Sequence, residues 1–135
     1  MSVAHIMKQL LSAVNYCHVA HKVVNRDLKC ENILVESIEY KYINNQRIPF
    51  YYIKISDFKS ARSYKTSKKL NKKVGNPYYI APEVLKRKYN EKCDLWSCGI
   101  IMYILLTGKP PYSGNTPKEI LSKVRTGTLE FFGNI

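Results

Sequence analysis

Apolar residues recur in steps of three and four along the start of the chain, and this pattern predicts an amphipathic helix over residues 2–20. A later, almost uninterrupted apolar run predicts a buried helix from Lys92 to about Thr107, which Gly108 and then Pro110-Pro111 bring to an end. We expect both helices to contribute to one hydrophobic core. The expected buried face of the first helix comprises Val3, Ile6, Met7, Leu10, Leu11, Val14 and Cys17.

Cap and turn residues place further elements. Thr116 suits a helix N-cap and Pro117 the first helical position, so a third helix is predicted to begin there and to end near Gly127. The pair Asn44-Asn45 predicts a hairpin turn between two strand-like runs. That hairpin is longer than a tight connection requires, and we interpret it as a surface insertion. The predicted strands are Val23-Val24, Ile33–Val35, Tyr40–Ile43 and Phe50–Ile55.

A dense polar stretch lies between two of these apolar flanks. Residues 25–32 hold six polar or charged side chains between Val23-Val24 and Ile33–Val35. β-branched flanks suit short buried strands, so the polar residues are expected on a loop that is fixed at both ends. A simple polar turn would explain any one of these residues, whereas chemistry would explain their combination. The six are Asn25, Arg26, Asp27, Lys29, Glu31 and Asn32.

The spacing of Asp27, Lys29 and Asn32 resembles the catalytic loop of protein kinases, in the form typical of serine/threonine kinases. Asp57-Phe58 resembles the start of the D-F-G motif, and residues 75–83 resemble the substrate-docking loop and A-P-E motif. The resemblance spans about residues 3–130 and is greatest to the calcium/calmodulin- and calcium-dependent protein kinase group. It implies a mainly α fold with short β-hairpins, in which residues 1–135 form a partial kinase C-lobe without the N-lobe and the last C-lobe helices.

The resemblance also implies roles for individual residues. Asp27, Lys29 and Asn32 would be catalytic: Asp27 would orient the hydroxyl of a protein Ser or Thr, and Lys29 would steady the γ-phosphate of ATP. Asn32 and Asp57 would hold Mg²⁺, and the expected cofactor-contacting set is Lys29, Glu31, Asn32 and Asp57. Glu31 would also favour a basic residue in the substrate.

Three residues depart from the kinase pattern. Asn25 stands where kinases usually have a histidine packed against the motif Phe, and Asn76 stands where serine/threonine kinases usually have a threonine bonded to the catalytic Asp and Lys. Lys59 replaces the motif glycine, and a left-handed backbone there would cost roughly 1–2 kcal/mol. These departures support an alternative function, a catalytically weak or inactive kinase-like binding module or a truncated gene product.

Two acidic residues are expected to have structural roles. Asp94 would tie the apolar helix to the backbone of the catalytic loop, and it could cap that helix as well. Glu83 is expected to lack its usual arginine partner, which a later C-lobe helix supplies in kinases. Without those helices, part of the face of the apolar helix is expected to be exposed.

The charge of the chain is uneven. The formal net charge is +12, and residues 59–73 contain seven basic and no acidic side chains. This stretch is either a solvated mobile loop or a site for an acidic or phosphorylated partner. Its Ser63, Tyr64, Thr66 and Ser67 could be phosphorylated, and Arg26 could pair with the phosphate. Aromatic-rich and nucleic-acid-binding motifs are absent from the sequence, so nucleic acid is not an expected partner.

The remaining chemistry of the sequence is limited. The four cysteines have no zinc-site spacing and are expected as reduced thiols in a reducing, cytoplasmic compartment. His5, His18 and His21 are expected to have no acidic or cysteine partners nearby, so they do not predict a metal site. No apolar stretch approaches the roughly 18 residues of a membrane span, and no EF-hand loop occurs. A membrane partner is therefore not expected, and calcium regulation is not encoded in these residues.

Overall fold

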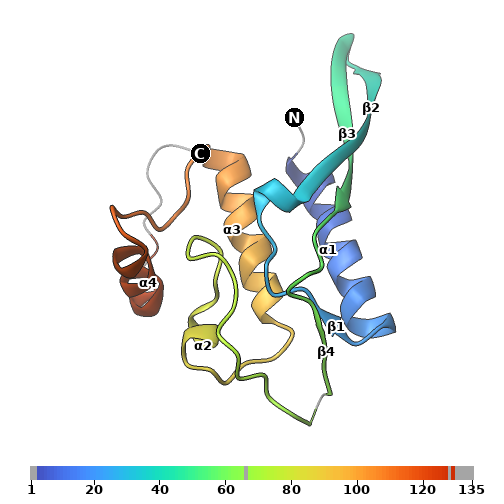
Figure 1. The fold of residues 1–135 in the computed structure, drawn as a ribbon. Helices are drawn as coiled ribbons and strands as arrows, with labels where there is room; N and C mark the ends of the chain where they lie inside the picture. The colour runs from blue at the N-terminus through green and yellow to red at the C-terminus, as the bar shows by residue number, and fades with distance from the viewer. Residues whose placement is uncertain (1–2, 66, 128, 130–135) are drawn as a thin grey trace.

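A computed structural model describes residues 3–65, 67–127 and 129. Within these ranges the fold is mixed, with four α-helices, a short 3-10 helix and two small antiparallel sheets (Figure 1). It is compatible with the predicted partial kinase lobe. No helix in the described ranges is both long and apolar enough to cross a membrane. The elements are α1 (Val3–Ala20), β1 (Val23–Val24), η1 (Cys30–Asn32), β2 (Ile33–Ile43), β3 (Gln46–Ile55), β4 (Arg62–Ser63), α2 (Pro82–Leu85), α3 (Cys93–Thr107) and α4 (Pro117–Thr126).

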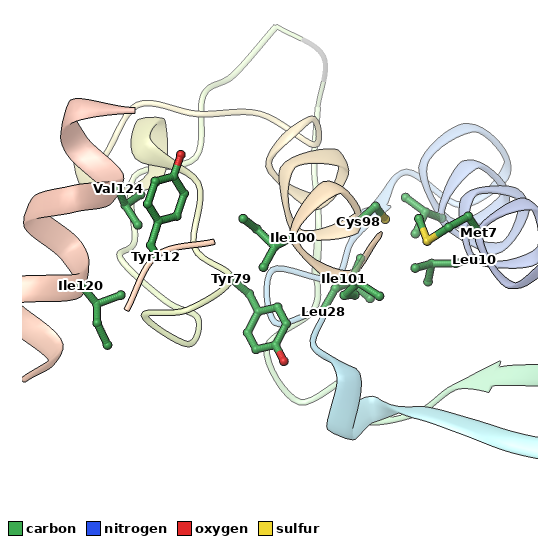
Figure 2. Close-up of a cluster of buried hydrophobic side chains, with 11 residues drawn as sticks. Met7, Leu10, Leu28, Tyr79, Cys98, Ile100, Ile101, Tyr112, Ile120 and Val124 are labelled. Atoms are coloured by element: carbon green, nitrogen blue, oxygen red, sulfur yellow. The ribbon is translucent and has the colours of Figure 1, made fainter. Parts of the chain in front are cut away.

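The main core lies along α3, which is drawn between α1 and α4 in Figure 1. Met7 and Leu10 of α1 pack with Cys98 and Ile101 of α3, because the three- and four-residue spacing keeps these side chains on facing sides of the two helices. Figure 2 shows how Leu28 and Tyr79, which come from loops, join the same cluster. On the α4 side the cluster continues through Ile100, Tyr112, Ile120 and Val124.

The predicted face of α1 is confirmed except at Leu11, with Val3 and Cys17 half-buried at its ends. Ile6, Met7, Leu10 and Val14 are buried, but Leu11 is exposed, so its inclusion in the buried face was wrong. His18, four residues after Val14, is buried at the end of this face. Its ring is hydrogen-bonded to the buried carboxylate of Asp94 on α3.

The hairpin is longer and more regular than predicted. β2 and β3 form one continuous antiparallel ladder from Ile33↔Ile55 to Ile43↔Gln46, with one irregularity near Val35. The turn at Asn44-Asn45 is confirmed, and both residues have the positive φ (49° and 61°) that a tight hairpin turn requires. The inner strand β3 rests on α1, where the Gln9 side chain bonds the backbone of Tyr51 and Ile53.

The ends of α3 and α4 follow the predicted cap signals. Gly108 and Gly127 both adopt the left-handed C-cap conformation, and the hydroxyl of Thr116 accepts a hydrogen bond from the Glu119 backbone N–H at 3.3 Å. One face of α3 is exposed, as predicted. Leu95, Met102 and Leu106 reach solvent there, and an apolar pocket of about 260 Å³ opens beside Met102 and Leu106.

Candidate active site

The loop after β1 holds three of the predicted site residues close together. The Lys29 ammonium lies 3.3 Å from the Asp27 carboxylate, and the Asn32 side-chain amide donates to the Asp27 backbone carbonyl at 3.2 Å. Asn32 is buried at the end of η1, while Asp27 and Lys29 are half-buried. The loop therefore presents one carboxylate and one ammonium at a partly open surface, with a buried amide behind them.

Asp94, which lies on α3, holds the backbone of this loop in position. Its carboxylate, only 1% exposed, accepts hydrogen bonds from the Asn25 and Arg26 backbone N–H groups at 2.8 Å each. The predicted tie between the apolar helix and the catalytic loop is thus confirmed. The cap role is not observed, because Lys92 occupies the N-cap position and makes no side-chain cap bond.

His18 also binds Asp94, and this contact was missed in the sequence. Its Nε2 donates to the Asp94 carboxylate at 2.8 Å, although the two residues are 76 positions apart. The prediction that the histidines lack acidic partners was therefore wrong for His18, because proximity in sequence does not report proximity in space. One sequence feature does indicate that His18 is buried. It lies four residues after Val14, the last buried apolar residue of α1, and therefore on the same helix face.

A second loop joins the first through Asn32. The backbone carbonyl of Asn32 accepts hydrogen bonds from the Ser56 N–H at 2.8 Å and the Ser56 hydroxyl at 3.1 Å. Asp57 follows directly, with an exposed side chain and a φ of 60°. The structure thus brings Asp57 next to the residues of the first loop.

The backbone strain predicted at Lys59 is not present. Among the described residues with positive φ, Lys59 does not appear and Asp57 does. The Lys59 N–H donates to the Asp57 carboxylate at 3.2 Å, so the left-handed turn falls two residues earlier than the missing glycine. An aspartate tolerates this conformation because its short side chain can bond the local backbone.

Phe58, at the position of the motif Phe, lies at the surface of the protein. The side chain is 44% exposed and lines a surface pocket beside Ala13 and Cys17 of α1. Asn25, at the histidine position, turns its Oδ1 toward its own loop and accepts the Asp27 N–H at 3.0 Å. Since this short amide offers no ring for packing, Phe58 has no aromatic partner there. The Asn25 Nδ2 is buried without a hydrogen-bond partner among the described residues.

Tyr79 connects the docking loop to the catalytic loop and was not singled out from the sequence. Its hydroxyl donates to the Glu31 carboxylate at 3.2 Å, and its backbone carbonyl accepts from the Ser97 hydroxyl of α3. Burial, followed by a hydrogen bond with Cys30, raises the pKa of Tyr79 well above its usual value. The hydroxyl therefore stays protonated and donates to Glu31, so one Glu31 oxygen is already hydrogen-bonded within the protein.

Asn76 does not take over the predicted role of threonine in this structure. Its side-chain oxygen accepts the Tyr78 N–H at 3.0 Å within its own loop, with no bond to Asp27 or Lys29 in the described chain. The neighbouring Gly75 does fit the catalytic loop closely. Its φ is 114°, and a Cβ at this position would lie 2.9 Å from the Arg26 carbonyl oxygen.

Arg26 is already engaged by protein groups. Its guanidinium donates to the Ser60 carbonyl from two nitrogens, at 2.8 and 2.6 Å, and lies 3.5 Å from the Tyr89 hydroxyl. The Tyr89 hydroxyl in turn donates to the Lys72 carbonyl at 2.6 Å. The predicted pairing of Arg26 with a phosphate would have to replace these bonds.

The oxygen groups at this site fit a magnesium ion that is shared with a phosphate ligand. Mg²⁺ binds carboxylate and amide oxygens and keeps several positions for water or phosphate. Asn32 uses its Nδ2 in the bond to Asp27 and leaves Oδ1 as a ligand, and one oxygen of Asp57 is uncommitted. The described residues include no group of three or more His, Cys, Asp or Glu side chains that could hold a metal alone.

The four cysteines are free thiols in this structure. Cys93 and Cys98 are buried, and Cys17 and Cys30 are half-buried. Burial and then the nearby Asp94 charge raise the pKa of Cys98 to about 12. Both effects also raise the pKa of Cys93.

Glu83, which was expected to lack its usual arginine partner, forms no ion pair within the described residues.

Comparison with known proteins identifies close relatives. Residues 1–132 match the family described as "Protein kinase domain". The chain is 48% identical over 128 residues to calcium-dependent protein kinase 4 of Plasmodium berghei (strain Anka), which covers 95% of this chain and 22% of that relative. The protein of the same name from Plasmodium falciparum (isolate 3D7) is 47% identical over 128 residues, with the same coverage.

Calcium-dependent protein kinase 5 of Plasmodium berghei (strain Anka) is 46% identical over 130 residues, or 96% of this chain and 21% of the relative. The chain thus spans about a fifth of the length of the curated relatives that it matches.

Proposed function

The chain belongs to the protein kinase family, and from this premise we propose that it supplies the catalytic loop and activation segment of a serine/threonine kinase. The reaction would transfer the γ-phosphoryl group of ATP to Ser or Thr hydroxyls of proteins. The observation that carries the proposal is the junction at Asn32, where its amide holds the Asp27 carbonyl and its own carbonyl holds Ser56, next to Asp57.

In this proposal Asp27 receives the proton of the substrate hydroxyl. Its backbone is held by the Asn25 side chain, and the neighbouring amides by Asp94, so the carboxylate has a defined position before substrate arrives. Lys29, at 3.3 Å, places a positive charge where the transferred phosphoryl group gains negative charge. Positioning and charge stabilisation are the main contributions that a protein makes to this reaction.

Asn32 and Asp57 would hold Mg²⁺ through their free oxygens, and Lys29 would contact the phosphates of ATP. The bound magnesium–nucleotide complex would supply the transferable phosphoryl group. Glu31 fits this set less well, since one of its oxygens is bonded to Tyr79. The four free thiols support a reducing, cytoplasmic compartment for the protein.

A kinase-like binding module is the second candidate. The exposed Phe58 favours it, together with the Asn25 Nδ2 group, which has no hydrogen-bond partner among the described residues. A thermal-shift measurement with millimolar Mg-ATP separates the candidates. A binding module would show no rise in melting temperature, whereas a kinase site would show one because ligand binding stabilises the folded state.

The proposed activity is tested on the native protein at the length that its source cells make, assayed for transfer of labelled phosphate from ATP to serine peptides. We expect Asp27→Asn to lower the rate at least about a hundredfold, because the proton acceptor is lost. Glu36→Gln is the control, since Glu36 lies on the exposed hairpin in an ion pair with Lys54. An unchanged rate in Asp27→Asn would refute the proposal.

A further inference from the structure

Nearly all of the net charge of the chain lies on two short stretches. Residues 59–73 carry seven basic side chains and residues 86–88 carry three, with no acidic side chain in either stretch. The other 12 basic and 10 acidic residues leave the rest of the chain at only +2, out of a total of +12. We call the ten side chains the basic surface: Lys59, Arg62, Lys65, Lys68, Lys69, Lys72, Lys73, Lys86, Arg87 and Lys88.

An antiparallel bridge between Leu70 and Tyr89 joins the two stretches. The backbones exchange hydrogen bonds of 2.8 and 3.1 Å, so the bridge holds both stretches in place. Tyr89 is buried and Leu70 packs on the same cluster beneath it. Because neighbouring residues in extended backbone point to opposite faces, Lys69 and Lys88 point away from the core on the same side.

The charges of the basic surface are not neutralised within the protein. All ten side chains are exposed, and none makes an ion pair with any acidic residue in the described ranges. Several like charges at this spacing raise the local potential and attract anionic groups. The basic surface thus has positive charge that is available to an anionic group outside the described residues.

The basic surface adjoins the proposed catalytic loop. The Tyr89 hydroxyl lies 3.5 Å from the guanidinium of Arg26, and Arg26 is the residue before Asp27. On the other side, Gly75 lies so near the Arg26 carbonyl that an added Cβ would stand 2.9 Å away. Lys72 and Lys73, three and two residues before Gly75, therefore belong to the segment that contacts the backbone of the proposed catalytic loop.

We propose that the basic surface binds acidic residues of the protein substrate, so that the kinase favours Ser or Thr flanked by Asp and Glu. This inference rests on the proposed function and names the substrate class of that site. It differs from the expected preference of Glu31 for a basic residue, because Glu31 is a single carboxylate that is already bonded to Tyr79. The basic surface, in contrast, has ten cations that form no ion pair within the described residues. Arg26 does not contribute, because Ser60 and Tyr89 occupy its guanidinium.

A protein segment fits the surface better than a nucleic acid. Binding of single-stranded nucleic acid combines basic groups with exposed aromatic rings on which bases stack. The aromatic residue at the centre of the basic surface, Tyr89, is buried, and its hydroxyl is bonded to the Lys72 carbonyl. The Tyr89 ring is therefore closed to bases, and the exposed rings of Phe58 and Tyr78 lie just outside the two basic stretches.

Peptide binding to the native protein, without nucleotide, tests the inference. Fluorescence anisotropy would compare a labelled serine peptide flanked by glutamates, the same peptide with glutamines, and a single-stranded oligonucleotide of the same charge as the acidic peptide. We expect the acidic peptide to bind at least about tenfold more tightly than the neutral one at low salt, with the difference lost near 1 M salt because of screening.

Two matched variants locate the site. Lys69→Gln/Lys72→Gln/Lys88→Gln should abolish most of the preference for the acidic peptide. Lys8→Gln/Lys109→Gln/Lys118→Gln removes the same charge from exposed positions elsewhere and should retain it. Equal losses in the two variants would overturn the inference, because the binding would then reflect net charge alone.

Two further results would contradict the proposed binding of acidic protein segments. One is equal affinity for the acidic and neutral peptides, and the other is tighter binding of the oligonucleotide than of the acidic peptide. The assay contains no ATP, so it is independent of the activity test. A protein that binds the acidic peptide but transfers no phosphate would refute the proposed function and leave the acidic-segment site supported.

Discussion

At the scale of single residues, three hydrogen bonds of 2.8 Å converge on the buried carboxylate of Asp94. Two come from backbone N–H groups of the proposed catalytic loop and one from the His18 ring. A buried carboxylate is costly unless it is fully bonded, and these donors supply that compensation. Asp94 thus links α3, the end of α1 and the loop that carries Asp27.

We expect Asp94→Asn to lower the free energy of unfolding by about 3 kcal/mol, because an amide is a weaker acceptor and places an NH₂ group opposite existing donors. Chemical denaturation followed by circular dichroism measures the change. Glu36→Gln provides the control, and its exposed ion pair should contribute less than about 1 kcal/mol. Similar losses in the two variants would contradict a special role for Asp94.

Cys98 makes the stability depend on pH in the alkaline range. Its pKa rises from 9.0 to about 12 on folding, so above pH 9 the folded state keeps a proton that the unfolded state releases. This contribution to stability is complete below pH 9 and is lost as the pH rises toward 12.

Urea unfolding at pH 8, 9 and 10 should therefore show a steeper loss of stability in the native protein than in Cys98→Ala. The limiting difference in slope is about 1.4 kcal/mol per pH unit. The comparison uses slopes, so the cavity left by the alanine does not affect it. Parallel curves would show that the thiol is not protected as described.

At the scale of elements, the β2–β3 hairpin is stabilised by contacts along its own ladder and by one side packing on α1. Arg47 stacks on the Tyr40 ring at 3.7 Å, and Lys41 lies 4.9 Å from the Phe50 ring centre. Such cation–aromatic pairs each contribute about 0.5–1 kcal/mol at exposed sites. The turn then determines the register, since both of its residues need positive φ.

Asn45→Gly should stabilise the hairpin tip and Asn45→Val should destabilise it by about 1 kcal/mol or more, because only glycine adopts a φ of 61° without steric cost. Limited trypsin digestion reports on the tip through cleavage after Lys41 and Arg47. We expect cleavage to be faster in Asn45→Val and slower in Asn45→Gly than in the native protein. The reverse order would show that another feature sets the register.

At the scale of the whole molecule, the core is continuous from α1 to α4, but one face of α3 is uncovered. Met102 and Leu106 are 44% and 53% exposed beside an apolar pocket of about 260 Å³. Trp96 and Leu129 also line this pocket. Contiguous apolar surface of this kind promotes association between molecules.

The variant Met102→Gln/Leu106→Gln should decrease self-association at high protein concentration without lowering the melting temperature substantially, because both side chains already contact water. Light scattering and a thermal melt measure the two effects. Ile101→Gln is the contrasting variant, since Ile101 is buried in the main core and a polar group there should unfold the protein. Unchanged light scattering in the double variant would exclude this face as the cause of association.

Much of this structure was predictable from local sequence. The periodicity of α1 and α3, the cap at Thr116, the glycines that end α3 and α4 and the turn at Asn44-Asn45 all depend on residues within a few positions of one another. The same holds for the kinase motifs, whose spacing indicated the family before any contact was known. Local steric and hydrogen-bonding preferences are sufficient to encode such features.

Only the tertiary structure decided which distant residues meet. The pairing of His18 with Asp94, the exposure of Phe58 and the bridge that joins residues 86–88 to the basic segment depend on how helices and loops pack. Leu11 shows the same limit, since an apolar residue at the border of a helix face is buried only where a neighbouring element covers it. The sequence by itself determined the elements and the chemistry they carry, whereas packing determined the partners, because contact between distant residues depends on the arrangement of the whole core.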